Sequence, residues 1–256
     1  MKTSLARWAA AACVLASTPA QSFVLGPTTP GKWGSPVFGT GATVSYSFMP
    51  TGTSCSSEGP GCTITELGLF GPSFPVWRSE IEAAFAAWSA VADIHFTEVP
   101  DAGEAFDAPQ LSGDIRIGGH ALFAGLAHGF FPPANGLSAA GDLHFDTSTC
   151  WEDVFDGSGD SCFSIFQVAA HEIGHILGLD ESSVPGSLMN PFYTESFSGP
   201  QFDDAAGAAF IYGPAASTPG DGGSGGGGSG VPEPMTLALL ASALLAAGLA
   251  RQSGRA

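Results

Sequence analysis

Three observations predict that the chain folds as an α+β domain in which helices pack on a β-sheet. Ser164 and Gln167 have the S-x-x-Q spacing of a capping box ahead of an apolar stretch, which predicts that a helix starts at Ser164. Residues 76–91 carry one apolar stripe, which is typical of a helix packed on a sheet. Residues 43–49 and 94–99 alternate in polarity, as half-buried strands do.

The remaining elements follow in chain order. Residues 21–41 are rich in Gly and Pro and predict an extended lead-in. The apolar stripe of the 76–91 helix consists of Val76, Ile81, Ala84, Phe85 and Trp88. A further short strand is expected at 114–117, and a closing helix at 200–212 with Pro200 in its first turn.

The most informative stretch is AAHEIGHILGLDE, residues 169–181. His171 and His175 are four residues apart, so a helix places both imidazoles on one face, close enough to hold one cation. Two neutral imidazoles suit zinc, which in a catalytic site keeps three protein ligands and one open position. Glu172 lies beside them and is expected to reach a water molecule without being a ligand.

A third ligand is expected after the helix ends. Gly178 is the expected C-cap, where a left-handed glycine turns the chain back, and Glu181 follows three residues later. A carboxylate can complete a two-histidine zinc site, so Glu181 is the predicted third ligand. The alternative is that Glu181 is an ordinary solvated carboxylate beside Asp180.

The pattern H-E-x-x-H-x-x-G-x-x-E, followed by Ser187-Leu188-Met189-Asn190-Pro191, resembles the zinc signature and Met-turn of the matrixins, a metzincin family. This resemblance implies a zincin fold over residues 42–213, with a twisted mixed β-sheet that includes strands at 126–132 and 141–146. It also implies a zinc-dependent endopeptidase acting on proteins or peptides. It implies that Glu172 is the general base and that Met189 forms an apolar floor. Glu181 replaces the third histidine of the family. Residues 126–132 resemble the edge strand that receives the substrate, and residues 191–193 the wall of the following pocket.

The resemblance also indicates further metal sites. His120, His128 and His144 match histidines that hold a structural zinc ion in matrixins, but Leu122 stands in the place of the aspartate ligand. A three-ligand remnant is weaker than a closed tetrahedral site, and plain core or surface histidines are the alternative. Asp142 and Asp146 match family positions for calcium, although Thr147-Ser148-Thr149 lacks the expected carboxylate.

The charge balance restricts the partners. The formal net charge is −17, and between residues 21 and 212 only Lys32, Arg78 and Arg116 stand against 22 acidic residues. Such a surface argues against nucleic acid and anionic membrane as partners. It is compatible with binding of calcium or of cationic substrates. Solubility in an exposed setting is the alternative explanation.

The first 20 residues predict a secretory signal peptide, with Lys2 and Arg7 ahead of an apolar run and a small residue at the expected cleavage site. Cys13 would leave with this peptide. Four cysteines then remain in an oxidising compartment, and of the three connectivities the two local pairs are favoured, Cys55–Cys62 and Cys150–Cys162.

Residues 214–230 predict a flexible Gly/Ser linker. Residues 231–256, with Val-Pro-Glu-Pro, an apolar run and terminal arginines, resemble a PEP-CTERM sorting tail. This resemblance implies a membrane sorting enzyme of the exosortase type as a partner, transient membrane contact, and an extracellular or cell-surface location. A permanent single-span anchor is the alternative.

The sequence thus predicts a secreted or surface-tethered zinc metalloendopeptidase. The rival hypothesis is a non-catalytic matrix or surface protein that keeps the peptidase fold as a scaffold. A carbohydrate-binding module of the extracellular matrix is a third, supported only by the tail and scattered aromatic residues.

Overall fold

The computed structural model describes residues 22–29, 31–65, 77–106, 112–133, 139–152 and 162–215. The signal peptide, most of the linker and the sorting tail expected from the sequence lie outside these residues. The elements are β1 (Val24–Leu25), β2 (Ala42–Phe48), α1 (Trp77–Ser89), β3 (Ile94–Glu98), β4 (Ile115–His120), β5 (Ala127–Gly129), β6 (Leu143–Asp146), β7 (Trp151–Glu152), β8 (Phe163–Ser164), α2 (Ile165–Ile176), β9 (Leu179–Asp180) and α3 (Phe202–Tyr212).

The main sheet has five strands in the order β3-β2-β4-β6-β5. The first four run parallel, and β5 pairs antiparallel with β6 at the edge. This confirms the predicted α+β class with a mixed sheet. It also confirms an edge strand within residues 126–132.

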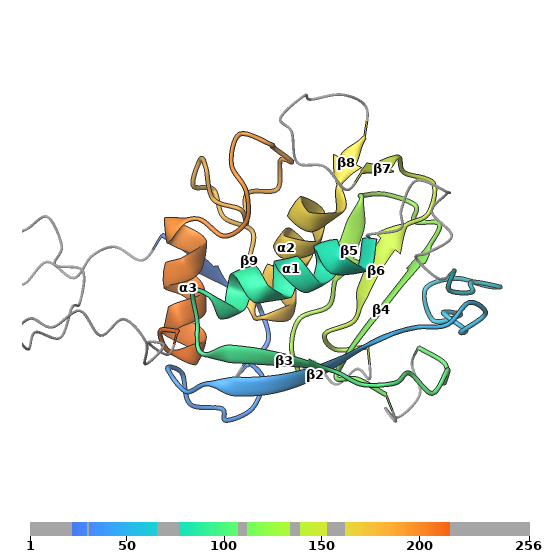
Figure 1. The fold of residues 1–256 in the computed structure, drawn as a ribbon, viewed down its shortest axis with the longest axis horizontal. Helices are drawn as coiled ribbons and strands as arrows, with labels where there is room; N and C mark the ends of the chain where they lie inside the picture. Colours follow the sequence, from blue (N-terminus) through green and yellow to red (C-terminus); the bar gives the residue numbers. More distant parts are fainter. Residues whose placement is uncertain are drawn as a thin grey trace, which may run out of the picture. The chain divides into compact units, whose positions relative to one another are not determined.

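Helices α1 and α2 pack against each other beside the sheet (Figure 1). The buried positions of α1 are Ile81, Ala84, Phe85 and Trp88, which is the predicted apolar stripe without Val76, a residue outside the described range. The Trp88 indole donates a hydrogen bond to the carbonyl of Ala170, 2.8 Å away. This bond fixes α1 along the helix that carries the paired histidines.

Helix α2 begins as predicted but only half of the capping box forms. Ser164 is the N-cap, and its hydroxyl accepts the Gln167 N–H. The Gln167 side chain instead contacts the following loop, donating to the carbonyls of Thr194 and Phe197 and accepting from the Gly199 N–H. Gln167 therefore ties the 194–199 loop to the helix rather than capping it.

The other end of α2 differs by one residue from the prediction. Leu177 is the C-cap, and Gly178 follows it with a φ of 102°, a region that a side chain would rarely adopt. The last carbonyls are satisfied from distant segments, since the Trp33 indole donates to Ile176 and the Tyr212 hydroxyl to Leu177. The chain can therefore leave the helix and turn sharply without losing hydrogen bonds.

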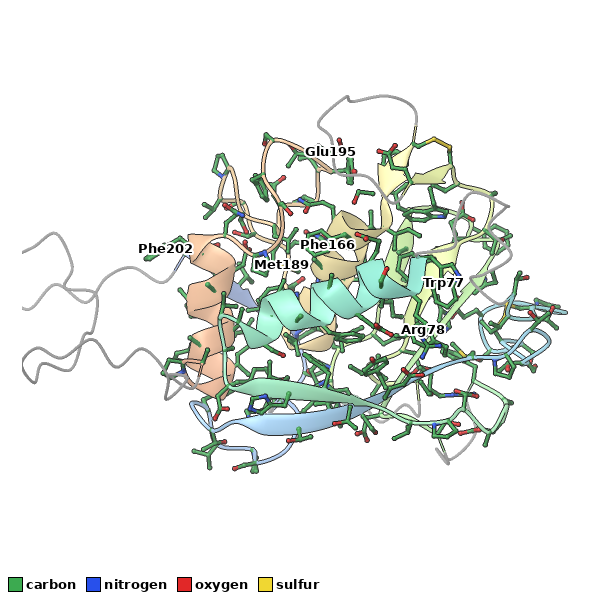
Figure 2. All side chains as sticks on the ribbon, in the orientation of Figure 1. Trp77, Arg78, Phe166, Met189, Glu195 and Phe202 are labelled. Carbon is green, nitrogen blue, oxygen red and sulfur yellow. A yellow bond between two sulfur atoms is a disulfide. The ribbon has the colours of Figure 1, made fainter. Side chains whose placement is uncertain are left out.

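Helix α3 begins at Phe202, with Gln201 as N-cap, so Pro200 precedes the cap and does not lie in the first turn. The reason is that the Asp204 carboxylate accepts the Gln201 N–H at 2.7 Å, which sets the cap at that residue. Phe202 itself is 90% exposed and points away from the body of the domain (Figure 2).

Both predicted disulfides, Cys55–Cys62 and Cys150–Cys162, are present. The first closes a loop between β2 and α1, and the second joins the segments around β7 and β8. No helix among the described residues is long and apolar enough to cross a membrane.

Candidate active site

The paired histidines of α2 are oriented by the backbone around them. His171 Nδ1 lies 2.7 Å from the carbonyl of Leu188, and His175 Nδ1 lies 2.9 Å from that of Leu179. A carbonyl only accepts, so each Nδ1 carries a proton, and in the neutral imidazole the lone pair is on Nε2. This arrangement directs both lone pairs toward one point, as metal-binding histidines require.

The turn after Gly178 brings Glu181 to the same point. Its Oε1 lies 3.8 Å from His171 Nε2 and 3.7 Å from His175 Nε2. Ligands about 2.0–2.2 Å from a tetrahedral zinc ion lie roughly 3.3–3.6 Å from one another, so a small inward shift of one half-exposed side chain satisfies the geometry. The three residues present two imidazoles and one carboxylate, and this donor set fits zinc.

The pKa values of His171 and Glu181 are shifted because the two side chains face each other. Burial opposes protonation of His171, but the Glu181 carboxylate and the nearby Glu172 charge outweigh it and raise the His171 pKa to about 9. Burial alone would raise the pKa of Glu181, whereas the two imidazoles lower it to about 2. Glu181 therefore stays ionised, which is the form that binds a metal ion.

Glu172 is held at the floor of the site. Its side chain is largely buried, and Oε2 accepts a hydrogen bond from the Gly129 N–H at 2.8 Å. Gly129 belongs to edge strand β5. The predicted base is therefore anchored to the strand along which the resemblance places a substrate.

The Met-turn lies beneath the histidines. Met189 is only 2% exposed, and a Cβ added to Gly174 would lie 2.2 Å from its sulfur. Asp204 of α3 holds the turn by accepting from the Leu188 N–H at 2.7 Å and the Met189 N–H at 3.1 Å. The turn that supplies the Leu188 carbonyl to His171 is thus fixed from α3.

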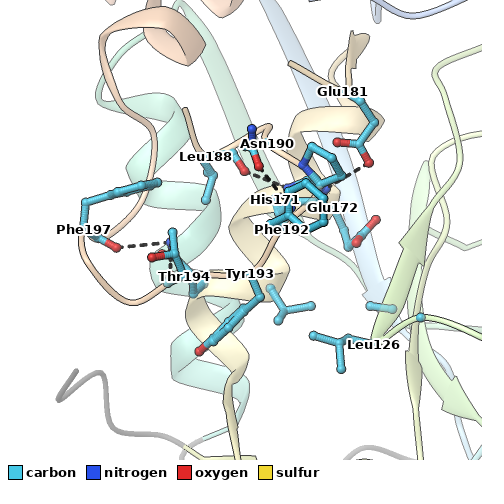
Figure 3. Close-up of a pocket in the computed structure, with 15 residues that line it drawn as sticks. Leu126, His171, Glu172, Glu181, Leu188, Asn190, Phe192, Tyr193, Thr194 and Phe197 are labelled. Atoms are coloured by element: carbon cyan, nitrogen blue, oxygen red, sulfur yellow. Dashed lines mark hydrogen bonds and ion pairs between the residues drawn. The ribbon is translucent and has the colours of Figure 1, made fainter. Parts of the chain in front are cut away.

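A pocket of about 230 Å³ opens beside His171 and Glu172 (Figure 3). Its walls come from β5, α2 and the segment after the Met-turn. The apolar members are Leu126, Ala127, Val168, Leu188, Pro191, Phe192, Tyr193 and Phe197. The predicted wall residues 191–193 are among them. The Tyr193 hydroxyl accepts the Ser164 N–H at 2.9 Å, which ties this wall to the start of α2.

A second cluster forms around the other three predicted histidines. His128 and His144 face each other across β5 and β6, and His120 comes from the end of β4. His120 Nε2 and His144 Nδ1 are 3.3 Å apart. Glu58 joins them, with Oε1 2.7 Å from His144 Nδ1 and Oε2 3.0 Å from His120 Nε2.

Glu58 is the member of this second cluster that the sequence did not predict. It lies more than 60 residues before His120, in a loop with no metal-binding spacing, so only the tertiary fold could reveal it. Burial would raise its pKa, but hydrogen bonds from the three histidines hold the pKa well below its usual range. Burial lowers the pKa of His144 to about 4, which keeps this imidazole neutral.

Both predicted calcium ligands accept hydrogen bonds from the protein. Asp142 is fully buried; its Oδ1 accepts the Arg116 N–H at 3.0 Å, and its Oδ2 has no hydrogen-bond partner among the described residues. Asp146 accepts from the Leu122 N–H and from the hydroxyls of Ser148 and Thr149. Within the described part of the chain, neither joins a group of three or more metal-binding side chains.

The fold and the first site define a class. A helix carrying two histidines and a glutamate, a glycine turn leading to Glu181, and a methionine turn beneath resemble the arrangement of the metzincin metallopeptidases.

Comparison with known proteins specifies the family. Residues 75–213, more than half of the chain, match the matrixin family, and the chain belongs to it. Matrixins are zinc metalloendopeptidases that use zinc and calcium ions.

Several curated relatives match at similar levels. The chain is 39% identical to karilysin of Tannerella forsythia over 128 residues, which cover 46% of this chain and 24% of karilysin. It is 39% identical to interstitial collagenase of Bos taurus over 142 residues, 53% of this chain and 28% of the relative. Stromelysin-3 of Xenopus laevis is 37% identical over 155 residues, 56% and 29% respectively. The matches therefore span about a quarter of the length of these relatives.

Proposed function

We propose that this chain is a zinc-dependent endopeptidase in which His171, His175 and Glu181 hold the metal ion. The observation that carries the proposal is the convergence of two Nε2 atoms and one carboxylate oxygen beside a pocket and the edge strand β5. A structural helix would not need three such groups turned toward one another.

Bound zinc would supply a Lewis acid for the scissile carbonyl and lower the pKa of the attacking water. Glu172 takes the proton from that water and delivers it to the leaving amine. Its hydrogen bond to the Gly129 N–H holds the carboxylate in place for both transfers. The carbonyls of Leu188 and Leu179 keep the imidazoles in the required tautomer.

The substrate is an extended polypeptide that adds to β5 as an antiparallel strand, so much of its binding comes from backbone hydrogen bonds. The side chain after the scissile bond enters the adjacent pocket. Because that pocket is lined mainly by apolar side chains, an apolar residue is expected there.

The test pairs metal analysis with proteolysis. Purified full-length protein should cleave unfolded casein, lose this activity with a chelator and regain it with zinc. Glu172→Gln should lower the rate of cleavage by roughly 10²-fold or more, while leaving the zinc content unchanged. Glu82→Gln, at an exposed position of α1, is the matched control and should retain activity.

The scaffold hypothesis has one observation in its favour, the carboxylate at position 181 where the family has histidine. It predicts zinc binding without cleavage of any polypeptide, in the wild type as in Glu172→Gln. Cleavage by the wild type but not by Glu172→Gln would exclude the scaffold hypothesis.

We further propose that the protein is exported and sorted by its tail. The signal-like residues 1–20, the tail 231–256 and the two disulfides support this, since disulfides persist in oxidising compartments. Mass spectrometry of the mature protein tests it. Intact termini in a cytoplasmic fraction would contradict the proposal.

A further inference from the structure

The second cluster contains a carboxylate that compensates for Leu122. Where the family resemblance placed an aspartate two residues after His120, this chain has an apolar side chain. In the structure the gap is filled from elsewhere in the chain, because Glu58 lies within 3.3 Å of all three histidines.

The contacts within the cluster are at or below the separations that a tetrahedral zinc site requires. Edges of roughly 3.3–3.6 Å are expected between zinc ligands. The His120–His144 and Glu58–His128 contacts are both 3.3 Å, and the other two Glu58 contacts are 3.0 and 2.7 Å. The cluster is thus slightly contracted around its centre, and each histidine presents one ring nitrogen to it.

Burial also favours a structural ion. The side chains of His144 and His120 are 0% and 7% exposed, that of Glu58 is 18% exposed, and that of His128 is 35% exposed. A cluster whose two inner imidazoles are this far from solvent gains most from a divalent cation that all four groups share.

The loop that carries Glu58 is built rigidly. The Cys55–Cys62 disulfide closes it, and the Cys55 N–H donates to the Cys62 carbonyl at 3.1 Å. The Glu58 N–H donates to the Cys55 carbonyl at 2.9 Å, which forms a tight turn inside the ring. Both half-cystines lie close to His120, so the ring rests on the cluster itself.

A small apolar core anchors the same loop to the sheet. Met49, Cys55, Ile64, Phe106 and Ala139 form this core, separate from the main one. The Thr65 N–H donates to the Gly119 carbonyl of β4 at 2.6 Å. The position of Glu58 over the histidines is therefore set by covalent, apolar and backbone contacts together.

We propose that Glu58 is the fourth ligand of a structural zinc site with His120, His128 and His144, and that the Cys55–Cys62 disulfide positions it. The ion then crosslinks the disulfide loop to β4, β5 and β6. This proposal concerns a site apart from Glu172 and does not depend on catalysis.

Zinc titration tests the role of Glu58. To isolate the second site, the ion is titrated into full-length protein carrying His175→Ala, in competition with a chromophoric chelator. This background should bind one equivalent tightly. Adding Glu58→Gln should weaken binding by roughly 100-fold or more, because a direct ligand contributes more than the outer partners of ligands do. Adding Ser57→Ala, a neighbour on the same loop, should leave the affinity within about twofold.

A positive control separates the possible outcomes. His128→Ala in the same background should abolish tight binding. If His128→Ala does so while Glu58→Gln leaves affinity unchanged, Glu58 is a bystander and the proposal is wrong. If the background itself binds no zinc, the second site does not exist, although the catalytic proposal survives.

Hydrogen exchange on the wild-type protein provides a test that needs no variant. Addition of zinc should slow amide exchange in residues 55–62, and prior reduction of the disulfide should diminish that protection. Equal exchange in this loop with and without zinc would overturn the proposed crosslink.

Discussion

Replacing Gly174 with alanine is expected to destabilise the protein, because the Met189 side chain packs directly against this position. In Gly174→Ala the new methyl carbon would lie 2.2 Å from the Met189 sulfur and 3.1 Å from Trp88 Cζ2. Carbon and sulfur atoms normally approach to about 3.5–4.0 Å, and Met189 is buried, so it has little room to withdraw. Overpacking of this severity costs about 2–3 kcal/mol, and the better helix propensity of alanine returns about 1 kcal/mol. The net loss should be about 1–2 kcal/mol.

A double-mutant cycle with Met189→Ala tests this reasoning. Alone, Met189→Ala should cost about 2–5 kcal/mol through the cavity it leaves. In that background the Gly174→Ala change should cost under about 0.5 kcal/mol, giving a coupling of about 1–2 kcal/mol. Urea unfolding at fixed zinc concentration measures all four proteins. If the two changes add within about 0.5 kcal/mol, the contact does not limit residue 174.

Two further predictions concern charges. Glu181→His should shift the acid limb of the pH–rate profile to lower pH, because a neutral third ligand leaves more positive charge at the site and water there ionises more readily; an alkaline shift would contradict this. Asp101→Asn should destabilise the protein by about 3 kcal/mol at pH 7, since it leaves the buried Arg116 guanidinium without its bidentate partner. Burial would raise the pKa of Asp101, but the Arg116 bonds lower it in the folded state. The pair's stabilisation is therefore complete above about pH 4 and is lost as the pH falls through the folded pKa, so the deficit of Asp101→Asn should shrink in acid unfolding curves. A deficit independent of pH would refute the ion pair as its cause.

Local signals in the sequence predicted the elements well. Polarity alternation and the apolar stripe of residues 76–91 record which faces are buried, and β2, β3 and α1 follow them within one or two residues. The misplaced boundaries, at Leu177 and Pro200, were settled by partners distant in sequence or by a competing cap. Propensity does not contain this information.

The convergence of the first three groups could be predicted because they lie within eleven residues. Helical spacing places His171 beside His175, and one glycine turn returns Glu181 to them. The second cluster could be predicted only in part. His128 and His144 lie on strands that the family resemblance implied, but Glu58 belongs to a loop without periodicity.

By itself, the sequence determined the local patterns: the paired histidines, the glutamate beside them, the methionine turn and the even set of cysteines are all properties of short segments. Only the tertiary structure decided that Gly129 anchors Glu172, that Asp204 fixes the Met-turn and that Glu58 meets three histidines. Each of these contacts joins residues separated by at least 15 positions, and the packing of the sheet, helices and disulfide loop brings them together.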